Sequence, residues 1–300
     1  MMPDHIGGCN ATNGDIESAR SEGVLGSHAG PVNSLAFLPD GQGLVSASPA
    51  EAARVWGMDE LVSPQGGAVT TVTAGIPIGS GSYGVLRGSR RTVLVAQENT
   101  GTLTVRDAQS GDRIAIVAGA ESPISSLAVC SDGAVLATGH LDGTIRLYKF
   151  AADGATAFDS EPRPPNQTFA AHLAPVRSLA FAPSGELLAS ASGDASVKLW
   201  IVRQGGSSGD IVSGTGFVSA LAFSPRDDML AIGRVDGQVQ LWDLTRRQLL
   251  AELPTESRAV RTIAFSTDGR FLATGGSGPL ITLWKLGALR GQLSELGLDW

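Results

Sequence analysis

Histidine and aspartate are the residues of this chain that could perform acid–base or metal chemistry, and they recur close together. His172 and Asp194 lie within one repeated stretch, and His140 stands two residues before Asp142. A histidine beside a carboxylate can transfer protons or hold a metal ion. A metal site would need more ligands near His140 than the sequence supplies. We therefore predict no metal and no cofactor, and we expect structural positions for these side chains.

Two glycine-rich strings match motifs of catalytic or cofactor-binding proteins. Residues 79–84 fit the dinucleotide-binding fingerprint, and residues 205–209 fit the nucleophile elbow of hydrolases. Both motifs function only where a strand leads directly into a helix. No helical pattern follows residue 84, and residues 205–209 lie in a linker-like Gly/Ser run. Neither string therefore predicts a cofactor site or a catalytic serine.

Six segments of the chain end in the same kind of short strand. They end near Trp56, Arg106, Tyr148, Trp200, Trp242 and Trp284, at spacings of 50, 42, 52, 42 and 42 residues. A period of roughly 40–45 residues is typical of propeller blades, each a four-stranded sheet. We predict an all-β fold, a closed β-propeller of about six four-stranded blades. A poorly matching second repeat and insertions at 58–67 and 151–167 leave seven blades open.

Each repeat begins with a strand that alternates bulky and small apolar residues, as in residues 176–181 and 260–265. This pattern suits strands buried on both faces. A turn such as Pro183-Ser184-Gly185 follows, in which proline and glycine set the turn torsions. A second strand comes next, so the repeats are meanders of hairpins.

The composition of the chain argues against some classes of partner and favours one cellular compartment. The formal net charge of −7 disfavours nucleic acid, whose phosphates require a basic face. No apolar run approaches the roughly 20 residues that span a bilayer, and residues 1–26 lack the apolar core of a signal peptide. Cys9 and Cys130 are the two cysteines, which favours a reducing compartment. We therefore predict a cytoplasmic protein that does not bind membranes.

With these repeats, residues 24–286 resemble the WD-repeat family of β-propellers. The resemblance implies a buried, hydrogen-bonded tetrad of histidine, serine or threonine, aspartate and tryptophan in each blade. The fourth repeat has the full set, His172, Ser190, Asp194 and Trp200. Other repeats keep only parts of it: His28, Ser46 and Trp56; Thr138 and Asp142; Asp236 and Trp242; Thr274 and Trp284. The resemblance thus favours a structural role for the recurrent histidines and aspartates.

The resemblance also predicts how the chain is divided. We expect a flexible leader at 1–22, the propeller at 23–286 and a tail at 287–300. Residues 23–26 should form the outer strand of the last blade, the one that ends at Trp284, because an unclosed ring would leave bare sheet edges.

The same resemblance places a partner-binding surface at one mouth of the ring. It is lined by the position after the valine or isoleucine that opens each inner strand, and by residues just before the turn aspartate. The predicted partner-binding residues are Asn33, Tyr83, Ser125, His140, Arg177, Phe217, Ser219, Arg234 and Arg261, with Leu141 and Val235 beside them. Tyrosine, phenylalanine and arginine suit an interface, and the arginines suit an acidic or C-terminal peptide.

These observations favour a non-catalytic scaffold that binds a protein or peptide, acidic ones included, as a monomer within a larger assembly. One alternative is a regulatory module of a larger signalling protein, such as one linked to a kinase. Another is a propeller hydrolase or lyase, which would need converging acids and bases at the mouth. The predicted mouth positions contain arginine, serine and His140 but no carboxylate.

Overall fold

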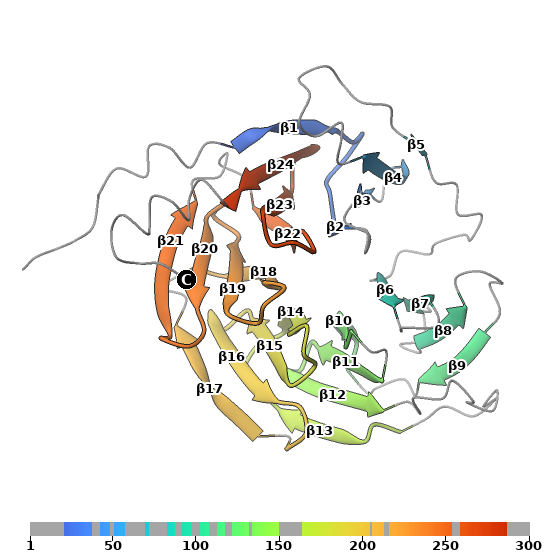
Figure 1. Ribbon diagram of the computed structural model, residues 1–300. Helices are drawn as coiled ribbons and strands as arrows, with labels where there is room; N and C mark the ends of the chain where they lie inside the picture. The colour runs from blue at the N-terminus through green and yellow to red at the C-terminus, as the bar shows by residue number, and fades with distance from the viewer. Residues whose placement is uncertain are drawn as a thin grey trace, which may run out of the picture.

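The computed structural model describes residues 21–37, 43–48, 51–57, 70–71, 83–87, 92–97, 103–107, 113–117, 122–131, 134–149, 164–204, 206–212, 216–253 and 259–286. The described strands form six antiparallel sheets of four strands each. Figure 1 shows the sheets arranged around a centre, as the blades of a β-propeller. Strands β2, β6, β10, β14, β18 and β22 lie innermost, and each blade is named here after its innermost strand.

The strand bounds follow the predicted repeats. The strands are β1 (Ser21–Ser27), β2 (Ser34–Phe37), β3 (Gly43–Ser48), β4 (Glu51–Gly57), β5 (Thr70–Thr71), β6 (Tyr83–Arg87), β7 (Thr92–Gln97), β8 (Leu103–Asp107), β9 (Arg113–Val117), β10 (Ile124–Val129), β11 (Val135–His140), β12 (Thr144–Lys149), β13 (Gln167–Ala170), β14 (Val176–Phe181), β15 (Leu187–Ser192), β16 (Ser196–Ile201), β17 (Gly206–Val212), β18 (Val218–Phe223), β19 (Met229–Arg234), β20 (Val239–Asp243), β21 (Gln248–Leu253), β22 (Val260–Phe265), β23 (Phe271–Gly276) and β24 (Leu280–Lys285).

Within a blade, the second strand places a leucine opposite the aromatic residue of the third strand. The register pairs Leu188 with Trp200, Leu230 with Trp242, and Leu272 with Trp284. All three leucines are fully buried. Burying a leucine contributes about 1.5–3 kcal/mol. The 42-residue spacing therefore brings the main apolar residues of successive blades into equivalent places.

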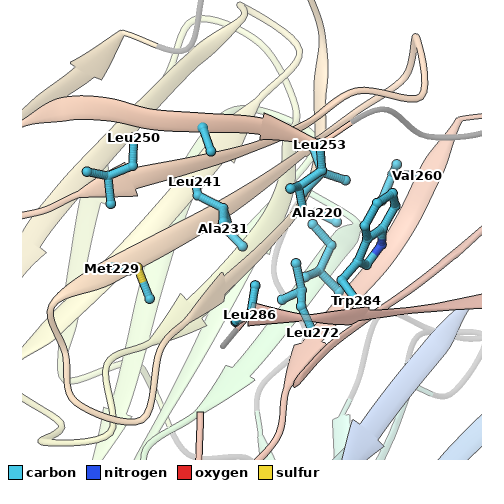
Figure 2. Packing of buried hydrophobic residues seen from close by; sticks show 13 residues of the cluster. Ala220, Met229, Ala231, Leu241, Leu250, Leu253, Val260, Leu272, Trp284 and Leu286 are labelled. Carbon is cyan, nitrogen blue, oxygen red and sulfur yellow. The ribbon is translucent and has the colours of Figure 1, made fainter. Parts of the chain in front are cut away.

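Blades pack face to face through apolar layers. Figure 2 shows the layer between the β18 and β22 blades, in which Leu253 lies close to Trp284, and Leu241 and Leu272 belong to the same buried cluster. A Cβ at residue 233 would lie 2.6 Å from Cγ1 of Val260. Glycine at this position therefore allows β19 to approach the innermost strand of the next blade.

The N-terminal strand joins the last blade. β1 pairs antiparallel with β24, in the register Ser21 to Trp284, Val24 to Thr282 and Ser27 to Leu280. This pairing was expected for residues 23–26, and the strand begins two residues earlier, at Ser21. The rest of the predicted leader and the tail at 287–300 lie outside the described residues.

Candidate partner-binding face

The candidate site lies at one end of the blades, which we call the entry face. Here the chain enters the innermost strands, and the second strand of each blade turns into the third. In the β14 blade, for example, Val176 at the start of β14 is paired with Ser192 at the end of β15. The histidine and the aspartate of the predicted tetrad and the predicted partner-binding residues belong to this end of the molecule.

The tetrad predicted for the β14 blade is a connected network. Nε1 of Trp200 donates to Oγ of Ser190 over 2.8 Å, and Oγ of Ser190 lies 2.7 Å from Nε2 of His172. Because the indole nitrogen can only donate, the serine hydroxyl is left to donate to Nε2. Nδ1 of His172 then donates to Asp194, whose Oδ2 is 3.3 Å away. Ser196 also donates its backbone N–H to Asp194, so each polar group is satisfied.

Other described blades keep parts of this network. In the β2 blade, Oγ of Ser46 lies 2.6 Å from Nε2 of His28 and accepts from Nε1 of Trp56 over 2.7 Å. In the β22 blade, Trp284 donates to Oγ1 of Thr274 over 3.3 Å. The recurrent histidines that we expected to be structural are therefore bound inside blades.

His140 was predicted to lie on a surface turn and to contact a partner, and this expectation is wrong. Its side chain is fully buried at the end of β11. Nδ1 donates to the carbonyl of Ser122 over 2.9 Å, and Nε2 lies 2.8 Å from Oγ1 of Thr138. The sequence has alanine, not histidine, 28 residues before Tyr148. His140 instead binds the threonine hydroxyl from the same strand, as His172 binds Ser190 in the next blade.

Arg234 was also predicted to bind a partner, and it too is buried, with 7% of its surface exposed. It occupies the same place at the end of β19 that His140 occupies at the end of β11. Its guanidinium group lies against Gly216, and Nη2 is 3.0 Å from Oδ2 of Asp236. The sequence has glycine, not histidine, 28 residues before Trp242. Arg234 therefore stabilises its own blade.

The β18 blade also satisfies its tryptophan differently. Ile232 stands where the β14 blade has Ser190, so no hydroxyl is present to accept from Trp242. Nε1 of Trp242 donates instead to Oε1 of Gln240 over 3.2 Å, and Gln240 donates to Glu252 over 2.8 Å. An acceptor for the indole is thus kept even where the tetrad is lost.

Ser125 and Ser219, both predicted at the mouth, are half-buried and join neighbouring blades. Oγ of Ser125 donates to the carbonyl of Val176 over 2.6 Å, and Oγ of Ser219 donates in the same way to the carbonyl of Val260. Their hydroxyls are therefore committed to bonds between the β10 and β14 blades and between the β18 and β22 blades.

The two intervening junctions use a different bond. Leu221 donates its N–H to Oγ of Ser178 over 3.1 Å, and Leu35 donates its N–H to Oγ1 of Thr262 over 3.0 Å. In these junctions the residue after the opening valine is an arginine, Arg177 or Arg261. The two kinds of junction alternate from the β10 blade round to the β2 blade.

The remaining predicted residues are exposed on the entry face. Nη1 of Arg261 donates to Oδ1 of Asn33 over 3.0 Å, which links the β22 and β2 blades. Arg177 is exposed over Gly193, and Phe217 has 60% of its surface exposed. Tyr83 begins β6, a strand whose side chains lie outside the description. The structure thus brings Arg177, Arg261, Asn33 and Phe217 to one accessible surface.

Three exposed apolar residues belong to the same face. Leu141 and Val235 precede the turn aspartates and are 46% and 49% exposed. Leu173, which was not among the predicted partner-binding residues, is 99% exposed. Leu173 directly follows the tetrad histidine His172 in the sequence, and this position could have indicated that it lies on the entry face. Large apolar side chains gathered on one exposed surface are a mark of an interaction site.

The electrostatics of the network favour neutral histidines. Burial lowers the pKa of both His140 and His172 below the ordinary value. Partial burial of Asp194 works against its charge, yet the hydrogen bonds from Ser196 hold its pKa at about 2. Among the residues that the structure describes, no group of three or more histidine, cysteine, aspartate or glutamate side chains is placed to hold a metal. Within the same residues, no helix has the length and apolar character to cross a membrane.

The buried histidines predict that stability falls as the solution becomes acidic. An unfolded histidine has a pKa near 6.5. Below that pH the unfolded chain binds protons that the folded chain excludes, so the free energy of unfolding decreases. We expect the urea midpoint to fall as the pH is lowered from 7.5 to 5.5. His140→Gln should reduce the dependence of the free energy of unfolding on pH by up to about 1.4 kcal/mol per pH unit. An identical pH slope for wild type and His140→Gln would contradict the neutral buried state.

Comparison with known proteins agrees with this geometry. The model of the WD domain, G-beta repeat, matches residues 19–57, 111–149 and 163–200, and that of the anaphase-promoting complex subunit 4 WD40 domain matches residues 221–286. The chain is 30% identical over 112 residues to WD repeat-containing protein SL1-17 of Schistosoma mansoni, which is 37% of this chain and 34% of that protein.

Two further relatives match over shorter stretches. Identity to the protein LST8 homolog of Dictyostelium discoideum is 32% over 85 residues, covering 28% of this chain and 26% of that protein. Identity to nuclear distribution protein PAC1 of Cryptococcus neoformans is 65% over 40 residues, covering 13% of this chain and 9% of that protein. The chain therefore matches about a third or less of the length of each of these relatives.

Proposed function

Because the chain belongs to the WD-repeat family of β-propellers, we propose that it is a non-catalytic scaffold that binds a protein or peptide partner across its entry face. One observation carries this proposal. Arg177 and Arg261 are exposed on the same face as Leu141, Phe217 and Val235. Arginine and aromatic side chains of this kind supply most of the binding energy in protein interfaces.

The charges on this face support an acidic partner segment. Neither Arg177 nor Arg261 forms an ion pair with a described residue, although the protein is acidic overall. The turn aspartates are already bound: Asp142 accepts from Thr144, and Asp236 contacts Arg234. The two guanidinium groups therefore remain open to carboxylates of a partner.

A continuous entry face needs a complete ring, and we include this in the proposal. The six described sheets are the blades, and the ring closes without a seventh. The contacts of β10 with β6 and β14, of β18 with β14 and β22, and of β2 with β22 support this arrangement. The junction between the β2 and β6 blades, adjacent in Figure 1, is the one that this proposal adds.

The geometry gives less support to a hydrolase or lyase at the same mouth. His140, the histidine predicted there, is buried and bound to Thr138 and Ser122. The hydroxyl of Ser219, a possible nucleophile, is bonded to the carbonyl of Val260. Cytoplasmic location, a monomeric state within a larger assembly and the absence of catalysis are further parts of the proposal.

Charge reversal at the two exposed arginines tests this function. We expect Arg177→Glu, Arg261→Glu to fold normally, because both side chains point to solvent, and to lose the partners that wild type captures from a lysate of the source cells. Binding of each captured partner, repeated with purified components, should weaken as salt rises from 50 to 500 mM, because exposed ion pairs are screened.

The matched control is Arg226→Glu, which reverses an exposed arginine at the opposite end of a blade. Arg226 lies in the turn between β18 and β19, away from the entry face. This variant should retain every partner. Undiminished binding by the double variant would refute the proposed face.

A further inference from the structure

The alternation of blade junctions divides the exposed part of the entry face into two similar units. In the first unit, the N–H of Leu141 donates to the carbonyl of Pro123 over 3.0 Å, so these two exposed residues lie side by side. In the second unit, the N–H of Val235 donates to the carbonyl of Phe217 over 2.9 Å. Each unit therefore begins with an exposed apolar pair from a single blade.

In both units the apolar pair is connected to an arginine by the same bond. Two residues after Pro123, Ser125 donates to the carbonyl of Val176, the residue before Arg177. Two residues after Phe217, Ser219 donates to the carbonyl of Val260, the residue before Arg261. Each arginine thus stands across one blade junction from its apolar pair.

The sequence repeats in the same two-blade rhythm. Residues 176–178 read Val-Arg-Ser and residues 260–262 read Val-Arg-Thr, whereas residue 125 of the β10 blade and residue 219 of the β18 blade are serine. Serine at this position forms the junction bond itself. Where this position is an arginine, the hydroxyl of the following Ser178 or Thr262 accepts the junction bond, and the arginine side chain is exposed.

We infer that the entry face carries two similar subsites, each of which binds one short acidic and apolar peptide motif. The first subsite is Pro123, Leu141 and Arg177, and the second is Phe217, Val235 and Arg261. The inference rests on the proposed function and specifies its partner: a protein or peptide in which the motif occurs twice. An arginine presents a planar fork that matches a carboxylate, and the apolar pair across the blade junction from it receives a leucine or phenylalanine of the motif.

The two subsites differ in one respect that affects their relative strength. Arg261 is held by Asn33, which restricts its rotamers before a partner arrives. Arg177 has no such contact among the described residues. Because an ordered side chain loses less conformational entropy on binding, the second subsite is expected to bind the same motif more tightly.

Two synthetic probes test this inference. The first is a short peptide with one Asp-Leu-Phe-Glu core, and the second carries two such cores joined by a Gly/Ser linker of about 20 residues, which spans roughly 25 Å. Isothermal titration of wild type with the single-core peptide should give two peptides bound per chain. The tandem peptide should bind one per chain and at least tenfold more tightly than the single core, because its second core binds intramolecularly.

Charge reversal at each arginine then separates the subsites. Arg177→Glu and Arg261→Glu should each bind one single-core peptide and should each lose the tandem advantage of at least tenfold. The double variant should bind neither probe, and Arg226→Glu should behave as wild type. Melting curves measured for all four variants check that they are folded.

The outcomes distinguish this inference from the function on which it rests. If wild type bound only one single-core peptide per chain, and only one of the two single variants lost that binding, the pair of subsites would be refuted. The proposed face would remain intact. Equal binding by wild type and the double variant would refute both. No binding of either peptide to wild type at millimolar concentration would overturn the assigned partner chemistry, while partners captured through the same arginines would still support the face.

Discussion

Removal of residues 1–27 is expected to make the protein aggregate, whereas removal of residues 1–20 should leave its melting temperature nearly unchanged. The longer deletion removes β1 entirely, and β1 is the strand that pairs with β24. Without it, β24 becomes a bare edge whose N–H and C=O groups can pair with another chain. The shorter deletion stops just before Ser21, where β1 begins.

Light scattering coupled to size exclusion, together with thermal melting, measures this effect. A synthetic peptide of residues 19–29, added to the longer deletion, serves as the matched control, because it restores the strand without restoring the covalent link. It should return part of the monomer. If the longer deletion were monomeric and melted like wild type, the edge of β24 would not depend on β1.

The period of the sequence was sufficient to predict the blades because each repeat carries its own core residues. Trp200, Trp242 and Trp284 recur every 42 residues, and each faces a leucine of the preceding strand. The resemblance to the WD-repeat family predicted the tetrad of the fourth repeat, and the 28-residue interval from His172 to Trp200 supported its register. Local patterns of this kind survive because strand alternation and turn chemistry act within a single repeat.

The positions of His140 and Arg234 could not be read from the same pattern. Both end the second strand of a blade, where the family pattern assigns no buried polar residue. Alternate residues of a strand point to the same side, so Thr138 and His140 were the one available hint. His140 turns inward and binds Thr138 in a blade whose preceding linker contains no histidine. Such compensation between distant positions is visible only once the blade is assembled.

The partner-binding residues were predicted from their positions in the repeats alone. That set therefore contained both residues that bond the next blade and residues that are exposed. Ser125 and Arg177 occupy equivalent places in neighbouring blades, yet the serine bonds the next blade and the arginine is exposed. Side-chain length decides between these outcomes, since a short hydroxyl reaches the adjacent backbone and a long guanidinium extends past it. The sequence contained this alternation, but the acceptor of each hydroxyl is known only from the structure.

Substitution of Ser190 by alanine is expected to destabilise the protein strongly, because it removes the one hydroxyl shared by Trp200 and His172. Ser190 accepts from Trp200 and donates to His172, and all three side chains are buried. Alanine would leave both partners without their hydrogen bond, and each buried unsatisfied group costs about 1–3 kcal/mol. We therefore expect a loss of about 2–5 kcal/mol in the free energy of unfolding, measured by urea denaturation and tryptophan fluorescence.

Two matched variants separate the network from simple loss of a side chain. Ser190→Thr keeps the hydroxyl, and threonine is native at the equivalent positions Thr138 and Thr274, so it should cost clearly less than Ser190→Ala. Ser184→Ala removes a hydroxyl from an exposed turn and should change the free energy of unfolding by less than about 0.5 kcal/mol. The β18 blade supports this reasoning, because there an isoleucine replaces the serine and Gln240 supplies the indole with another acceptor. If Ser190→Ala and Ser184→Ala unfolded at the same urea concentration, the serine would not be the centre of a stabilising network.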